Sequence, residues 1–247
     1  MAKQRLQKVL AAAGVDSRRR CEELILEGVV CVNDEVVDTL PAFVDPEHDV
    51  VTVNGVRLRA ARKVYYLLNK PKGVICSNQD PQGRTRAIDL VPNQERVFCV
   101  GRLDVDTMGL IILTNDSDLA NRLTHPRYEL PKTYVVSIKG RVDGEAIERL
   151  KGVRLSQGRA GKTFVKVLKR SVEESLVEIT IKQSLNRQIG KMLAIAGFRA
   201  KSLRRTRIGT IDGRGLAVGQ FRALSAAEVA YLRKATAGGR AGEQENR

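Results

Sequence analysis

A carboxylate between two glycines is the first candidate for chemistry in this 247-residue chain. Asp104 lies in the segment Gly-Arg-Leu-Asp-Val-Asp-Thr-Met-Gly-Leu at 101–110, and the glycines at 101 and 109 allow a backbone or a ligand to approach closely. A carboxylate in such a place can act as a nucleophile or as a general acid or base. An aspartate before Val-Asp-Thr is also typical of a turn that its side chain caps. Both interpretations are open at this point.

Two further motifs flank this segment. Asn-Lys-Pro-Lys-Gly precedes it at 69–73, and Asn-Arg-Gln-Ile follows it at 186–189. A carboxylate inside a closed pocket tends to become protonated, and an arginine within ion-pair reach lowers its pKa by about 1–3 units. The residues alone do not say which cation would do this, and Arg187 of the third motif can equally be one more phosphate-binding cation of a basic protein.

The charge balance indicates a polyanionic partner. Lys and Arg number 43 against 28 Asp and Glu, which gives a formal net charge of +15. Such an excess favours nucleic acid or an anionic membrane surface. No apolar run approaches the roughly 18–20 residues that span a bilayer, and no basic amphipathic helix carries Trp or Phe anchors. Nucleic acid is therefore the favoured partner.

The cysteines and histidines give no metal site, and none of the motifs implies a cofactor. The four cysteines show no CxxC spacing and only two histidines exist, so we predict no structural zinc. In a reducing compartment the thiols are best interpreted as small buried hydrophobes. The apolar stretch 9–15 is too short for a signal peptide, and Asp-Ser-Arg follows where a cleavage site should lie. We expect a cytoplasmic protein.

The first part of the chain is predicted to form a small α+β domain. Apolar residues at helical spacing predict a helix over 5–13, and a cap at Asp16-Ser17 predicts a second helix that ends at Gly28. Asn33-Asp34 predicts a hairpin turn, and Asn54-Gly55 predicts another turn after a strand at 50–53. Residues 59–63 are typical of a linker.

The rest of the chain is predicted to form a larger domain with an irregular mixture of strands and helices. The expected strands are 64–68, 110–114, 133–138, 163–168 and 176–181, and the expected helices are 118–124, 144–150, 187–196 and 225–234. Because strands and helices do not alternate, an α+β fold is favoured over a doubly wound sheet. The predicted boundaries are 1–61, 62–235 and a disordered Gly/Ala/polar tail at 236–247.

The N-terminal pattern resembles the S4 RNA-binding domain. Arg-Leu-Gln-Lys-Val-Leu at 5–10, Ser-Arg-Arg at 17–19 and the glycines at 14 and 28 fall in the order of that family. Two short helices on a small sheet would present one group of cations near a single surface, for contact with phosphates: Lys3, Arg5, Lys8, Arg18, Arg19 and Arg20. A solvated helix face is the simpler reading of a basic run. However, three arginines at a helix start oppose the helix dipole, which favours RNA binding.

The three motifs of the second part, in this order behind an S4-like domain, resemble the pseudouridine synthases of the ribosomal-RNA group. This resemblance implies a mixed, mainly antiparallel sheet with flanking helices, and isomerisation of a uridine in RNA without metal or redox cofactor. It assigns Asp104 as the carboxylate and Arg187 as its arginine. Tyr134 would stack on the base and remove its C5 proton, although a strand tyrosine is often plain packing. Lys70 and Arg102 are expected to bind RNA or to order the cleft, and Lys191 to bind RNA.

One departure affects the third motif, where the family usually continues with two basic residues and this chain has Gly190-Lys191. We expect the cations at 199, 201, 204, 205 and 207 to compensate for the missing charge. The alternative function is a non-catalytic RNA-binding or ribosome-assembly factor that kept the fold. The expected partner is ribosomal RNA or an assembly intermediate, with the large subunit slightly favoured and a monomer as the default.

Overall fold

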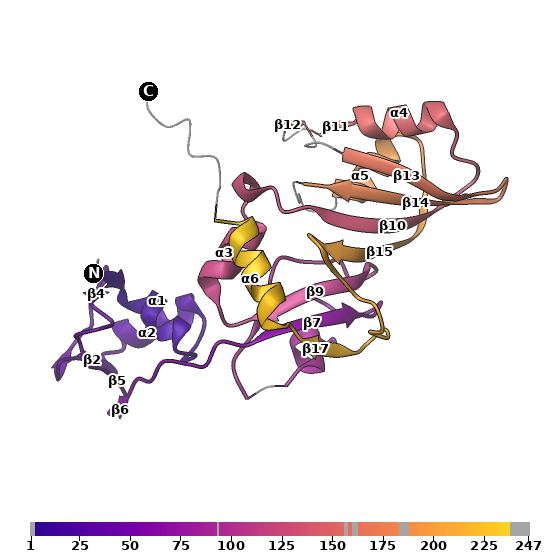
Figure 1. The fold of residues 1–247 in the computed structure, drawn as a ribbon. Helices are drawn as coiled ribbons and strands as arrows, with labels where there is room; N and C mark the ends of the chain where they lie inside the picture. Colours follow the sequence, from indigo (N-terminus) through magenta and orange to yellow (C-terminus); the bar gives the residue numbers. More distant parts are fainter. Residues whose placement is uncertain (1–2, 93, 156–157, 160–162, 183–187, 238–247) are drawn as a thin grey trace, which may run out of the picture. The chain divides into compact units, whose positions relative to one another are not determined.

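The structure is a computed structural model that describes residues 3–92, 94–155, 158–159, 163–182 and 188–237 (Figure 1). The chain divides into two compact units. The N-terminal unit comprises residues 1–64 with 94–96 and 115–117, and the sheet unit comprises the remainder. Within the described ranges, no helix has both the length and the apolar character needed to cross a membrane.

The N-terminal unit is a small α+β domain. Its two helices contribute apolar residues to one core, including Leu6, Leu10, Cys21 and Ile25, as the helical spacing of these residues predicted. Its elements are β1 (Gln4–Arg5), α1 (Leu6–Ala12), α2 (Arg18–Leu26), β2 (Val30–Val32), β3 (Glu35–Val36), β4 (Phe43–Val44), β5 (Val51–Val53) and β6 (Val56–Arg57). The strands form a β1-β4 pair and a four-stranded sheet in the order β3-β2-β5-β6.

Local sequence explains how these short elements begin and turn. The Ser17 hydroxyl accepts a hydrogen bond from the backbone N–H of Arg20 and so caps α2. Asn33 and Asp34 have φ angles of 51° and 67°, the left-handed pair that a tight hairpin turn requires. Both features confirm predictions made from the sequence.

The sheet unit is built on a nine-stranded sheet. Seven strands form the path β13-β14-β10-β15-β9-β7-β17, while β16 pairs with β15 and β8 with β9. The strands are β7 (Tyr65–Lys70), β8 (Phe98–Cys99), β9 (Met108–Thr114), β10 (Lys132–Lys139), β13 (Thr163–Arg170), β14 (Glu174–Ile181), β15 (Ala200–Ile208), β16 (Ile211–Asp212) and β17 (Phe221–Ala223). A separate pair joins β11 (Arg154–Leu155) to β12 (Gly158–Arg159).

All pairings in this sheet are antiparallel except one. Strands β9 and β15 run parallel, with Met108 and Gly109 beside Arg204 and Arg205. The predicted mixed, mainly antiparallel α+β architecture is therefore confirmed. Strand β15 itself was not predicted, because its cations were read as an RNA-facing cluster and not as a central strand.

Four α-helices accompany the sheet: α3 (Ser117–Thr124), α4 (Gly144–Gly152), α5 (Gln188–Ile195) and α6 (Ala226–Ala235). Two short 3-10 turns lie at Ala87–Leu90 and Pro126–Tyr128. Helices α3 and α6 lie side by side next to β7 and β9 (Figure 1) and share one apolar core with them, formed by residues that include Leu67, Ile112, Leu123 and Leu232.

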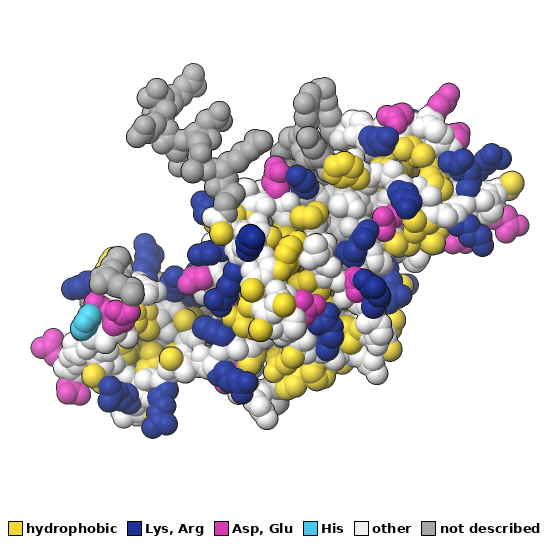
Figure 2. All heavy atoms as spheres, viewed as in Figure 1, with side chains coloured by type: hydrophobic (Ala, Val, Ile, Leu, Met, Phe, Trp, Pro, Cys, Tyr) yellow, Lys and Arg dark blue, Asp and Glu magenta, His cyan; other side chains and the backbone are white. Residues whose placement is uncertain are grey.

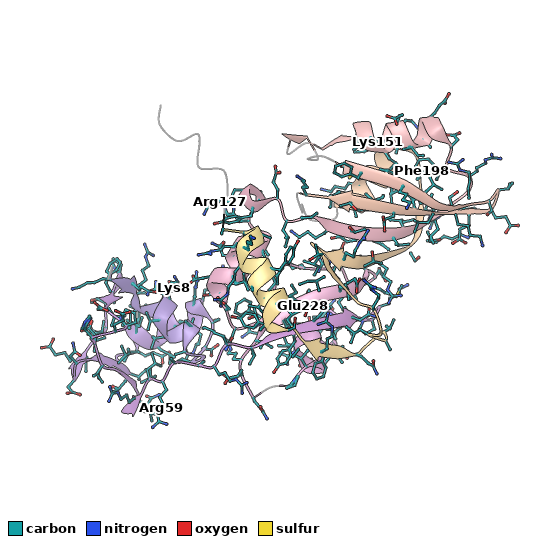
Figure 3. The ribbon with its side chains drawn as sticks, in the orientation of Figure 1. Lys8, Arg59, Arg127, Lys151, Phe198 and Glu228 are labelled. Atoms are coloured by element: carbon teal, nitrogen blue, oxygen red, sulfur yellow. The ribbon has the colours of Figure 1, made fainter. Side chains whose placement is uncertain are left out.

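The last helix begins at a cap that the sequence predicted. Ser225 accepts from the backbone N–H of Glu228, and the Glu228 carboxylate accepts from the backbone N–H of Ser225. Glu228, labelled in Figure 3, also binds Arg222 of β17 through two bonds of 2.7 Å. The cap thus ties α6 to an edge strand of the sheet. The predicted disordered tail lies, from residue 238 onward, outside the described residues.

Candidate active site

The sheet brings one residue from each of four adjacent strands into a transverse row. Tyr134 of β10 is opposite Arg205 of β15, which lies beside Gly109 of β9, which is in turn opposite Lys70 of β7. We call these four residues the central row. They are up to 135 positions apart in the sequence, so only the strand order places them side by side.

Gly109 allows the parallel strands to approach each other. Its φ is 105°, and a Cβ built there would lie 2.2 Å from the carbonyl oxygen of Arg205 and 2.6 Å from its nitrogen. These neighbours are backbone atoms, which cannot move aside as a flexible side chain can. The second glycine of the motif is therefore required for β15 to reach β9.

Asp104 lies on the turn that leads into β9. Its side chain is exposed, and its carbonyl oxygen accepts a hydrogen bond of 3.0 Å from the N–H of Thr107. The residues on either side of Asp104 form hydrogen bonds with the first motif and with a residue shortly after it. Val105 O accepts from Gly73 N at 2.8 Å, and Leu103 N donates to Cys76 Sγ at 3.4 Å. The structure thus joins the first two motifs around the predicted carboxylate.

Lys70 connects the first motif to the Asp104 turn through hydrogen bonds from its ammonium group. Its side chain is 0% exposed, and Nζ donates to the carbonyl oxygens of Val74 at 2.7 Å, Pro71 at 2.9 Å and Val105 at 3.5 Å. Burial lowers the pKa of Lys70, and nearby acidic groups, including Asp104, oppose that shift. Of the two expected roles, RNA binding or ordering the cleft, this geometry supports ordering. The ammonium is not presented to a ligand.

Two cysteines lie at the same junction. The bond from the Cys99 thiol is the main reason that the pKa of Cys76 lies below its ordinary value, and the pKa of Cys99 is raised in turn. Both are half-buried, whereas Cys21 belongs to the core of the N-terminal unit. The sequence predicted buried hydrophobes for all four thiols. Cys21 alone is fully buried among them.

Tyr134 and Arg205 are neighbours in the row, and both are buried. Tyr134 is 6% exposed and Arg205 is 3% exposed. Arg205 Nε donates to Leu110 O at 2.6 Å and Nη1 donates to the Tyr134 hydroxyl at 3.5 Å. The sequence placed Arg205 among cations that face RNA. Five cations between 199 and 207 look alike in the sequence, and no local signal marks the one that is buried.

Lys132 is a second buried cation that sequence reasoning missed. It lies two residues before Tyr134, is 8% exposed, and donates from Nζ to Leu123 O of α3 at 3.2 Å. Burial, with a smaller contribution from the charge of Arg205, lowers the pKa of Lys132 to about 8. Two buried cations therefore flank the tyrosine that was predicted to meet the base.

Of the remaining predicted site residues in the sheet unit, the structure describes all but one. Arg187 lies outside the described residues. Arg102 and Lys191 are exposed, as RNA contact requires. Gly190 is exposed on α5, and a Cβ there would meet nothing within 4 Å. Asp106 is exposed and pairs with Lys72 at 3.6 Å.

The six predicted cations of the N-terminal unit differ in their exposure and in their partners. Lys3, Arg5, Arg18 and Arg19 are exposed, while Lys8 on α1 (Figure 3) and Arg20 are half-buried. Arg20 donates to Glu23 at 2.8 Å and to Glu27 at 2.7 Å, and these bonds raise its pKa. No ion pair joins Arg18 or Arg19 to the described carboxylates. Figure 2 shows Lys and Arg side chains spread over the visible face of both units.

An open groove of about 410 Å³ lies on the sheet unit. Its cations include Arg204, Arg207 and Arg214, and two of these are paired: Arg207 with Glu178 at 3.1 Å and Arg214 with Asp212 at 2.9 Å. Neither Asp104 nor Tyr134 lines it, but Arg205 of the central row does, together with Leu110, whose carbonyl oxygen Arg205 binds. The groove therefore offers charge for RNA and borders the central row.

One group of side chains could hold a cation. Asp45, Glu47 and His48 have ligand atoms within 4.8 Å of one another, and this is the single such group among the residues that can be described. It lies in the N-terminal unit, two of its members are exposed, and Asp45 is already engaged by His48 and by the N–H of Glu47. It contributes nothing to the candidate active site.

Comparison with known proteins decides the family. The pattern of RNA pseudouridylate synthases matches residues 64–195, and the pattern of the S4 domain matches residues 4–50. The chain belongs to the RNA pseudouridylate synthase family. The matched region of this synthase contains Asp104, Tyr134 and Arg187, and the S4 match contains every predicted N-terminal cation except Lys3.

Relatives match this synthase over both units. It is 42% identical to a Bacillus subtilis protein named ribosomal large subunit pseudouridine synthase B, over 93% of this chain and 96% of the relative. A Pseudomonas aeruginosa protein of the same name is 38% identical over 93% of this chain and 61% of its own length. A crystal structure of a pseudouridylate synthase superimposes with a TM-score of 0.67 at 26% identity, covering 92% and 99% of the two chains. The predicted family, fold and enzyme class are confirmed.

Proposed function

We propose that this synthase converts one uridine of ribosomal RNA to pseudouridine, with the large-subunit RNA as substrate. The observation that carries the choice of substrate is the 42% identity, across both units, to a relative named for the large ribosomal subunit. The formal charge of +15 and the S4 match support RNA as the partner. We expect the enzyme to act in the cytoplasm as a monomer, on free ribosomal RNA or on an assembly intermediate.

Asp104 is the carboxylate that we assign to the chemistry. In the isomerisation the bond from the sugar carbon to N1 of uracil breaks, the base turns, and a bond to C5 forms. N1 gains a proton and C5 loses one, so the formula of the nucleotide is unchanged. The Asp104 carboxylate can attack the sugar or act as acid and base. The bonds that Gly73 and Cys76 make with its neighbours support this role, because they fix the turn from both sides.

Tyr134 and Arg187 complete the proposed machinery. A uridine in structured RNA must leave its stack to reach Asp104, and an aromatic ring can receive the extruded base. We assign that ring to Tyr134, whose hydroxyl would take the C5 proton. We assign Arg187 to keep the Asp104 carboxylate ionised in the closed complex. Both assignments are supported by their positions within the matched family region.

RNA binding is assigned to cations of both units that are exposed or half-buried. In the sheet unit these are Arg102 and Lys191, and in the N-terminal unit they are Lys3, Arg5, Lys8, Arg18, Arg19 and Arg20. Lys70 is withdrawn from this group, because its ammonium is fully buried. It acts in the proposal by ordering the turn that carries Asp104.

The test compares two neighbouring aspartates in cells that lack the gene. Asp104→Asn should fail to restore the missing pseudouridine in large-subunit RNA, because an amide can neither attack the sugar nor transfer a proton. Asp106→Asn, an exposed residue two positions away, should restore it. Purified enzyme should show the same split in tritium release from C5-labelled uridine. If Asp104→Asn restores the modification, the catalytic assignment is wrong. If the parent gene restores none, the chain is the RNA-binding factor without catalysis.

A further inference from the structure

Arg205 carries a buried charge whose use the proposed chemistry does not explain. Its side chain is 3% exposed, and no ion pair links it to a carboxylate within the described ranges. One of its nitrogens, Nη2, is buried with no hydrogen-bond partner among the described residues. Burying a cation without a carboxylate partner and without all of its hydrogen bonds is costly. A buried cation of this kind needs an explanation, and a role in the site is a candidate.

The two bonds of the guanidinium join two strands that carry proposed catalytic residues. Nε binds Leu110 O in β9, the strand that directly follows the Asp104 turn, at 2.6 Å. Nη1 binds the Tyr134 hydroxyl in β10 at 3.5 Å. Both nitrogens belong to one rigid plane, so the separation between Leu110 O and the Tyr134 hydroxyl is set by the guanidinium itself.

Arg205 is also the partner that orients the tyrosine. Within the described part of the chain, the Tyr134 hydroxyl has its hydrogen bond to Arg205 and the guanidinium carbon lies 6.0 Å from the ring centroid. The backbone of Arg205 is held by its close approach to Gly109. The Arg205 backbone is therefore held beside β9, and the Arg205 guanidinium in turn holds the Tyr134 hydroxyl.

We propose that Arg205 is a positioning residue that sets the Tyr134 ring and hydroxyl relative to the strand that follows Asp104. This inference rests on the proposed role of Tyr134. Arg205 borders the open groove, but its side chain is only 3% exposed. In this proposal it acts on the reaction through the tyrosine. Lysine cannot replace it, because one ammonium on a flexible stem cannot fix two acceptors in a plane.

The first test is a double-mutant cycle on the full-length enzyme. Arg205→Lys should lower the single-turnover rate at saturating enzyme by about tenfold to a hundredfold, the order of loss caused by a misplacement of about 1 Å. The Kd for the RNA should change less than about twofold. In a Tyr134→Phe background, the same substitution should change the rate less than about threefold, because the hydroxyl it acts through is gone.

Arg204→Met is the matched control for the cycle. Arg204 is the neighbouring cation on β15, and it is exposed. Its effect on rate and affinity should be the same in the parent and Tyr134→Phe backgrounds. If Arg205→Lys lowers the rate equally in both backgrounds, or weakens RNA binding while the saturating rate is kept, Arg205 is not a positioning residue for Tyr134.

A second measurement does not depend on catalysis. With ring-labelled tyrosine, the five tyrosines give separate NMR signals that a Tyr134→Phe variant assigns. Arg205→Lys should shift or broaden the Tyr134 ring signal in the free enzyme, and Arg204→Met should leave it in place. An unchanged Tyr134 signal in folded Arg205→Lys overturns the inference. If the signal shifts while the parent enzyme forms no pseudouridine, the proposed function fails and the contact stands.

Discussion

The sheet unit buries some of its cations, whereas the six predicted cations of the N-terminal unit are exposed or half-buried. In the N-terminal unit Lys3, Arg5, Arg18 and Arg19 are exposed, whereas in the sheet unit Lys70, Lys132 and Arg205 are at most 8% exposed. The exposed cations can release counterions from RNA phosphates, which contributes affinity that falls with salt. The buried cations bind backbone carbonyls and a tyrosine hydroxyl, which fixes geometry. The basic composition therefore includes cations of two kinds: those available to bind phosphates and those that fix the structure of the site.

The difference is sharpest where both kinds of cation lie close in sequence. Arg205 is buried against Tyr134, while Arg204 and Arg207 are exposed on the same strand. On β7 the last residue, Lys70, is fully buried, while Lys72 just beyond it pairs with an exposed Asp106. Position in the sheet, and not residue type, decides which cation is exposed and which is buried.

The largest effect should follow from removing a buried cation. Lys70→Met leaves the Val74 and Pro71 carbonyl oxygens without their donor, and each such loss costs about 1–3 kcal/mol. Relief of the buried charge offsets part of this. We expect the free energy of unfolding to fall by roughly 3 kcal/mol in urea titrations. Lys72→Met should cost less than about 1 kcal/mol, because an exposed ion pair contributes little. Equal losses would contradict the assigned roles.

The second effect concerns the pH dependence of stability. The pKa of Lys132 is about 8 in the folded chain, against an ordinary value of 10.5. Between these values the unfolded chain binds more protons, so the free energy of unfolding should rise as pH increases from about 8 to about 10.5. The rise due to Lys132 should be at most about 3 kcal/mol. Urea titrations across this range should show it in the parent.

Lys132→Met provides the control for this pH effect. Lys70, whose pKa is also lowered by burial, contributes in the same direction in both proteins. The difference between parent and variant therefore isolates Lys132. A difference that stays constant from pH 7 to pH 11 would show that Lys132 does not titrate in this range in the folded protein.

A smaller effect should follow from neutralising exposed cations of the N-terminal unit. Arg18→Gln with Arg19→Gln should weaken RNA binding and flatten the salt dependence of log Kd by about 0.7–0.9 per lost phosphate contact. The saturating rate should be kept. Arg20→Gln should change the salt slope less, because Glu23 and Glu27 already engage that guanidinium. Filter binding at several salt concentrations measures all three, and an equal slope for Arg20→Gln would contradict the distinction.

The smallest effect tests the departure in the third motif. Gly190→Arg should be accommodated, because a Cβ at this exposed helical position meets nothing within 4 Å. We expect RNA affinity to rise severalfold, the order of one added phosphate contact, and helix stability to rise by up to about 1 kcal/mol. Gly152→Arg adds the same charge to exposed α4 and should raise affinity less. If both variants bind alike, position 190 does not face the RNA.

The family, the α+β class and most local elements could be predicted without the structure. Glycines, caps and apolar spacing act over a few residues, so the turn at Asn33-Asp34, the start of α2 after Ser17 and the cap of α6 at Ser225 could be predicted. The motif around Asp104 could be recognised in the same way, because its residues are contiguous.

The burial of particular cations, and the contacts between residues far apart in the chain, could not be predicted in this way. Arg205 lies against Tyr134 and Gly109 because β15 enters the sheet between β10 and β9, strands more than 60 residues away in the chain. Burial of Lys70 and Lys132 depends in the same way on carbonyl acceptors from the Asp104 turn and from α3. A run of like charges contains no local signal for such partners. Their positions follow from strand order and register, which non-local packing sets.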